Sequence, residues 1–131
     1  MTYVSNDVTR IREVIQAVSA DTTLTAADSG KVFTLDATGE AITLPAVSDG
    51  VNFKFVSSVA ATGSSWTVAA TAAVIYGSIQ LAGAISAVSA KTTITLVADK
   101  FLPGDFIELV SDGTNWYLSG SIVTAAGMTV A

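Results

Sequence analysis

The side chains in this chain that could carry out nucleophilic or acid–base chemistry are serines, lysines and carboxylates. The sequence has no histidine and no cysteine, which removes the commonest general base, the commonest zinc ligand and every thiolate. A serine–lysine dyad remains formally possible. However, Ser29-Gly30-Lys31 fits neither a phosphate-binding loop nor a Ser-x-x-Lys motif. We therefore interpret the lysines as solvent-facing charges.

Paired carboxylates could in principle hydrolyse a glycosidic bond. Asp105 and Glu108 are three positions apart, so on a strand they face opposite sides of a sheet. Asp112 and Asn115 lack the spaced series of oxygen ligands that a dedicated calcium loop supplies. We interpret these side chains as turn formers that bond nearby backbone amides. The sequence therefore predicts no enzyme, no metal site and no cofactor.

Aromatic side chains could stack against sugar rings and so bind a glycan. The aromatics that such a platform would use are Trp66, Trp116, Tyr76 and Tyr117. Trp116 and Tyr117 are adjacent on a predicted strand, so they face opposite sides and cannot form one platform. We interpret each of the four as a plug in the core or in an interface.

The composition is that of a single packed domain. The chain has 131 residues, of which 50% are hydrophobic and only 13% are charged, so disorder is not expected. The formal net charge is −5. An acidic chain binds phosphate backbones and anionic membranes poorly, because both associations depend on Lys and Arg. We therefore expect neither nucleic acid nor a membrane as partner.

Charged residues are distributed very unevenly. No Asp, Glu, Lys or Arg occurs between Lys54 and Lys91, and none follows Asp112. Interface cores are depleted of charge, so we predict that these segments contact another subunit or a larger partner. The alternative is that Ser and Thr alone solvate these faces. A membrane span over residues 72–90 is disfavoured, because glycines, a glutamine and serines interrupt the apolar residues.

Helical periodicity is confined to residues 7–20. The apolar stripe of this segment consists of Val8, Ile11, Val14, Ile15 and Val18. We predict an N-terminal arm or helix over residues 1–20. All members of the stripe are β-branched, which is a weak choice for a helix, so the arm is expected to need a partner surface.

Residues 21–131 have the pattern of a single all-β domain. Stretches rich in β-branched and aromatic residues alternate with turn signals containing Gly, Asp, Asn and Pro. The predicted strands are 22–25, 31–36, 41–44, 51–56, 65–69, 74–81, 92–98, 106–111 and 115–122. This pattern predicts an antiparallel β-sandwich or jelly roll of about eight or nine short strands. No internal repeat of solenoid period is visible.

The clearest single element is a β-hairpin over residues 103–120. A Pro-Gly-Asp turn leads into an alternating strand at 106–111, and an Asp-Gly-Thr-Asn turn at 112–115 leads into an aromatic-rich return strand. Alternate residues of the first strand point to opposite sides, and both of its faces are largely apolar.

Two regions resemble small β-rich virion proteins of tailed bacteriophages. The first runs from Leu24 to Leu35, with the sequence LTAADSGKVFTL, and continues to Ile42-Thr43-Leu44-Pro45. The second is the hairpin, with its GDFIELVSDGTNWYLSG run, and the Asp99-to-Pro103 segment before it. The resemblance covers about residues 20–122 and leaves the N-terminal segment outside.

Within that class, a free-standing chain of this size resembles a capsid decoration (cement) protein. The resemblance implies a homotrimeric β-sandwich or β-tulip that binds the major capsid protein on the outer surface of an icosahedral capsid, so that the chain is located on the virion. Several such proteins contact the shell through an N-terminal arm. By that analogy the expected capsid contacts are Tyr3, Val4, Val8, Ile11, Val14, Ile15 and Val18.

Two other functions stay open at this stage. One is a tail-fibre or receptor-binding β-module that contacts a host-surface glycan, which would need an exposed aromatic or polar groove. The other is a structural or adhesive β-domain from a non-viral source.

Overall fold

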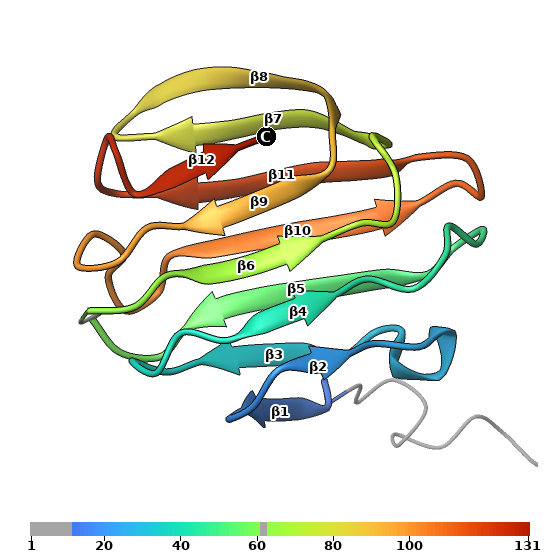
Figure 1. Ribbon diagram of the computed structural model, residues 1–131, viewed down its shortest axis with the longest axis horizontal. Coiled ribbons are helices and arrows are strands. Elements are labelled where there is room, and N and C mark those ends of the chain that lie inside the picture. Colours follow the sequence, from blue (N-terminus) through green and yellow to red (C-terminus); the bar gives the residue numbers. More distant parts are fainter. Residues whose placement is uncertain (1–11, 61–62) are drawn as a thin grey trace, which may run out of the picture.

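Two mixed β-sheets make up the fold in the computed structural model, which describes residues 12–60 and 63–131 (Figure 1). Sheet A contains, in spatial order, β1 (Ile15–Val18), β3 (Val32–Leu35), β5 (Asn52–Ser57), β10 (Phe106–Ser111), β11 (Trp116–Ile122), β7 (Ile75–Leu81) and β8 (Ala84–Lys91). Sheet B contains β12 (Met128–Val130), β9 (Thr93–Leu96), β6 (Trp66–Ala69), β4 (Ala41–Thr43) and β2 (Thr22–Thr23). One 3₁₀ turn, η1 (Ala26–Asp28), connects β2 to β3.

The predicted all-β class is confirmed, but the purely antiparallel arrangement is wrong. The strands β1, β3 and β5 are parallel to one another, as are β2, β4 and β6, and β7 is parallel to β11. The first six strands alternate between the two sheets, so the chain winds as a flattened coil. A parallel pair needs a crossover connection, and here the strand in the opposite sheet forms part of each crossover.

This winding was not visible as a repeat, because its turns have unequal lengths. Val32 of β3 pairs with Ile15 of β1 on one side and with Lys54 of β5 on the other, at unequal distances along the chain. From β7 onward most neighbouring strands are antiparallel. The hairpins β7–β8 and β10–β11 are antiparallel, and β9 pairs antiparallel with both β6 and β12. The first half of the chain therefore winds as a coil, whereas the second half adds strands that pair largely in antiparallel fashion.

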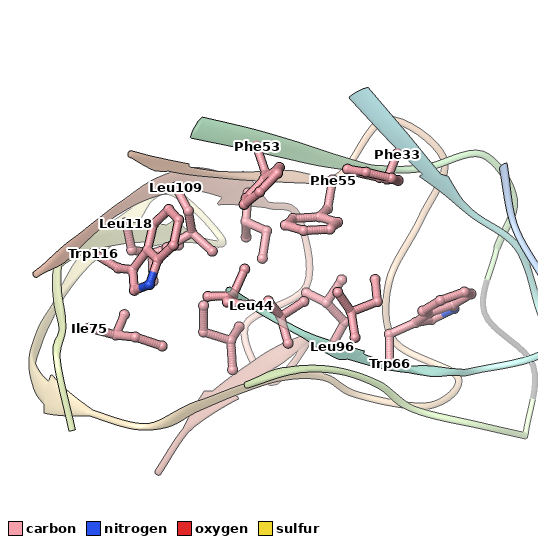
Figure 2. Packing of buried hydrophobic residues seen from close by; sticks show 14 of the residues in the cluster. Phe33, Leu44, Phe53, Phe55, Trp66, Ile75, Leu96, Leu109, Trp116 and Leu118 are labelled. Carbon is pink, nitrogen blue, oxygen red and sulfur yellow. The ribbon is translucent and has the colours of Figure 1, made fainter. Parts of the chain in front are cut away.

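The core lies between the two sheets as one continuous cluster (Figure 2). Phe33, Phe53 and Phe55 come from β3 and β5, with the Phe33 and Phe55 rings stacked at a centroid distance of 5.5 Å. Trp116 packs against Phe53 at 5.8 Å. Trp66 is fully buried, and its Nε1 donates a hydrogen bond of 2.8 Å to the carbonyl oxygen of Asp36. Both tryptophans are therefore core residues, as predicted.

The helix predicted at the N-terminus is wrong for residues 12–20, because this stretch is extended and forms β1. The remaining residues of the predicted arm or helix, 1–11, lie outside the described residues. In the register of β1 with β3, Ile15 pairs with Val32 on the outer face, whereas Val18 pairs with Leu35 on the core face. The β-branched composition that weakened the helix prediction suits a strand.

All nine strands predicted between residues 22 and 122 are present, whereas β1, β8 and β12 were missed. The hairpin β7–β8 was missed because its turn lacks the usual Asn-Gly or Asp-Gly signal. Leu81 pairs with Ala84, and the two loop residues, Ala82 and Gly83, have φ values of 49° and 83°. Two central residues with positive φ are the requirement of a type I′ hairpin turn. An alanine therefore occupies a position that normally favours Asn, Asp or Gly.

A buried carboxylate connects the start of β10 to two neighbouring segments. Asp105 is 3% exposed, and its Oδ2 accepts a hydrogen bond of 2.9 Å from the amide of Leu102. Its Oδ1 accepts one of 3.2 Å from the amide of Val123, just beyond β11. This geometry confirms the interpretation of Asp105 as a side chain that bonds nearby backbone amides.

Replacing Asp105 with asparagine is expected to lower the free energy of unfolding by about 1–3 kcal/mol. The amide NH₂ cannot accept a hydrogen bond, so one of the two buried backbone N–H groups loses its partner. Urea denaturation followed by circular dichroism measures the change. Asp49→Asn is the matched control, because Asp49 is exposed. Equal stability of the two variants would show that the hydrogen bonds of Asp105 contribute nothing.

Candidate interaction surface

The contact residues predicted at the N-terminus do not form one surface in the part of the chain that the structure describes. Tyr3, Val4, Val8 and Ile11 lie outside the described residues. Val14 and Ile15 are 59% and 61% exposed, whereas Val18 is buried in the core. Because Ile15 and Val18 are three positions apart on a strand, they point to opposite faces of sheet A.

The two charge-free segments, which are distant in the sequence, are adjacent in the fold. Residues 55–90 include β6, β7 and nearly all of β8, while residues 113–131 include β11 and β12. Because β11 pairs with β7 and β7 pairs with β8, these strands form one end of sheet A (Figure 1). The only charged residue in these three strands is Lys91, at the end of β8. We call β7, residues 84–90 of β8, the turn between these strands and Val123 the uncharged edge.

The uncharged edge presents apolar side chains and an open strand to solvent. Ile85 is 80% exposed and Val123 is 63% exposed. Among the described residues, β8 pairs with β7 alone, so one side of this eight-residue strand has no neighbouring strand. Soluble proteins usually protect such edges with charges, proline or a short strand. From Ala84 to Ala90 there is no charge and no proline, which suits a strand that another molecule covers.

Two pairs of opposite charge lie on other parts of the surface. The Nζ of Lys31 lies 2.7 Å from Oδ1 of Asp28, and that of Lys54 lies 3.4 Å from Oε1 of Glu108. Lys54 also lies over the ring of Phe106, 4.9 Å from its centroid. Exposed pairs of this kind contribute little to stability. Within the strands of sheet A, the charged residues are Lys54 in β5, Glu108 in β10 and Lys91 at the end of β8.

The acidic side chains in the turns accept hydrogen bonds from their own loops. The Lys31 ammonium and then the Thr25 amide lower the pKa of Asp28. The amides of Asn115 and Thr114, followed by the Tyr117 hydroxyl, lower the pKa of Asp112. Asp112 therefore acts as the turn former that the sequence predicted.

The four aromatics considered for a sugar platform separate into two buried and two outward-facing side chains. Trp66 and Trp116 are fully buried, which excludes them from any surface platform. Tyr117 is 42% exposed, and Tyr76 is half-buried. These two tyrosines are directly paired between the parallel strands β11 and β7, so both lie on the outer face of sheet A. This pairing could not be predicted from the sequence, because the two strands are far apart in the chain.

A shallow hollow lies beside Tyr117 on the outer face of sheet A. It has a volume of about 220 Å³. Its rim includes Tyr117 and Ser119 from β11, Val110 and Glu108 from β10, and Asn52 and Lys54 from β5. Glu13, Lys31 and Val32 also line the hollow, which therefore combines the outward-facing Tyr117 ring with apolar side chains and several hydrogen-bonding groups.

Within residues 12–60 and 63–131, no helix is long and apolar enough to cross a membrane. The same residues contain no group of three or more acidic, histidine or cysteine side chains that could hold a metal ion. No protein-family model and no curated protein matches the sequence. Function is therefore inferred from the fold, the surface chemistry and the sequence motifs.

Proposed function

We propose that this chain is a virion structural protein that decorates and stabilises an icosahedral phage capsid by binding its outer shell as a cement protein. The uncharged edge is the observation that carries the proposal, because it combines an open strand, exposed Ile85 and Val123, and an absence of carboxylates. The resemblance of residues 20–122 to phage virion proteins supports the same function. Two sheets around one core support a β-sandwich as the finer fold.

The proposed partners are the major capsid protein and further copies of this chain in a homotrimer. Copies with a net charge of −5 repel one another, so they are expected to meet through surfaces without carboxylates. A protein that binds the assembled lattice, and not the free subunits, stabilises the shell by mass action. A trimer would strengthen each weak contact through a high effective concentration of the others.

The first test measures the mass of the purified full-length chain by light scattering and its co-sedimentation with capsids stripped of accessory proteins. We expect a trimer that saturates the shell at a fixed ratio to the major capsid protein. A monomer that stays in the supernatant at all concentrations would contradict the proposal.

Introducing a charge into the uncharged edge is expected to weaken capsid binding. Ile85→Glu places a carboxylate at the centre of the proposed contact, and burying an unpaired charge should reduce the affinity by about tenfold or more. Thr114→Glu is the matched control, since it adds the same charge to the exposed β10–β11 turn. Unchanged binding of Ile85→Glu would exclude the uncharged edge as the contact.

A further inference from the structure

We propose that the outer face of sheet A carries a binding site for a neutral saccharide, formed by Tyr117, Asn52, Glu108, Lys54 and Ser119. The site is centred on β5, β10 and β11. Ile85 of the uncharged edge pairs with Gln80, near the opposite end of β7 from Tyr76. The saccharide site is therefore separate from the proposed capsid contact and does not rest on it.

The aromatic wall of the hollow is held in a fixed position. The hydroxyl of Tyr117 donates a hydrogen bond of 2.8 Å to Oδ2 of Asp112. Oδ1 of Asp112 accepts hydrogen bonds from the amides of Thr114 and Asn115, at 2.9 and 2.8 Å. Because Asp112 is itself part of a turn, it holds the Tyr117 side chain in place. This side chain therefore has little conformational entropy left to lose when a ligand packs against its ring. Tyr76 lies beside Tyr117 in the same row but belongs to β7 and does not line the hollow.

The polar side chains of the hollow offer both donors and acceptors. Glu108 and Lys54 are direct cross-strand partners on β10 and β5, and both side chains are substantially exposed. Asn52 follows the same outward alternation as Lys54, and its Nδ2 donates to the carbonyl oxygen of Gly50 at 3.1 Å. Hydroxyl groups both donate and accept, so a ligand rich in hydroxyls matches this mixture better than one with a single kind of polar group.

The form and charge of the site favour a neutral sugar. A sugar ring presents an apolar C–H face to an aromatic side chain and hydroxyls at its rim, which corresponds to one ring beside several polar groups. A volume of about 220 Å³ is suited to a single ring and is too small for a folded protein segment. The two lysines that line the hollow, Lys31 and Lys54, offset its two glutamates, Glu13 and Glu108, and the net charge of −5 disfavours acidic sugars.

Saturation-transfer NMR with the full-length chain tests the inference, using maltotriose, triacetylchitotriose and a sialylated trisaccharide as probes. We expect one of the two neutral probes to bind with an affinity in the millimolar range, since the hollow is small and open, and the sialylated probe to bind more weakly. Amide shifts in a ¹⁵N spectrum should be confined to β5, β10 and β11. Tyr117→Ala and Asn52→Ala should each reduce the affinity by about tenfold or more.

Leu102→Ala is the control variant, because Leu102 is exposed and lies outside both the hollow and the uncharged edge. The affinity of this variant for the probes should be unchanged. A dispersed ¹⁵N spectrum of each variant shows that it is folded. The inference is overturned if neither neutral probe binds at about 10 mM, or if binding survives both Tyr117→Ala and Asn52→Ala. Preferential binding of the sialylated probe would overturn it as well. Each of these results leaves the capsid-binding proposal unaffected, since that proposal is tested by co-sedimentation.

Discussion

Replacing Trp116 with alanine is expected to lower the free energy of unfolding by about 3–5 kcal/mol. The side chain of Trp116 is fully buried between the sheets and packs against Phe53 at a centroid distance of 5.8 Å (Figure 2). Removing it loses the transfer free energy of the indole and leaves a cavity that the surrounding strands cannot fill. A loss of this size is a large part of the total stability of a domain of this length.

Tyr117→Ala provides the comparison, because Tyr117 is the next residue on the same strand and faces solvent. Its loss removes an exposed hydrogen bond to Asp112, so we expect a decrease of less than about 1.5 kcal/mol. Urea denaturation of both variants measures the difference, with the slope of the transition checked for constancy. Similar losses for the two variants would contradict the burial of Trp116 on the core face.

Replacing Gly77 with alanine is expected to destabilise the protein by about 2–5 kcal/mol, through two separate effects. Gly77 has a φ of 132°, a backbone angle that residues other than glycine rarely adopt. A Cβ at this position would lie 2.2 Å from the carbonyl oxygen of Leu118, a backbone atom of the paired strand β11. The two strands would have to separate, which disrupts the centre of the parallel β7–β11 pairing.

Gly83→Ala separates conformational strain from crowding. Gly83 also has a positive φ, 83°, but a Cβ there meets no atom within 4 Å. We expect a loss of about 1–2 kcal/mol from strain alone. The difference between the two variants, measured by denaturation under the same conditions, then gives the cost of crowding at β11 together with the additional strain of the larger φ at Gly77. Equal losses would show that β7 and β11 are not in close contact at Gly77.

Apart from β8 and the turn before it, the strands and turns between residues 22 and 122 were determined by local sequence. The hairpin β10–β11 has the predicted alternation, with Ile107 and Leu109 buried and Glu108 exposed. The predicted opposition of Trp116 and Tyr117 is also confirmed. These features follow from the two-residue period of a strand and from the backbone preferences of turn residues, both of which act over a few positions.

Two strands that the sequence did not predict, β8 and β1, lack a distinctive strand pattern. The strand β8 consists largely of Ala and Ser, which have no strong strand preference, and its partner β7 stabilises it through backbone hydrogen bonds. In β1, the spacing of Val14, Ile15 and Val18 matches a helix as well as a strand. Pairing with β3 decides in favour of the strand, since the edge of sheet A offers backbone hydrogen bonds.

The sequence by itself determined that residues 21–131 form an all-β domain, where most of its turns lie, and that two long segments carry no charge. Only the tertiary structure decided which strands are neighbours. It brought β11, β7 and β8 together as one end of sheet A, and it placed Tyr76 beside Tyr117. The physical reason is that strand pairing joins backbone groups that are distant in the chain. These groups are chemically alike in every strand, so the choice of partner depends on how all the side chains fill one core.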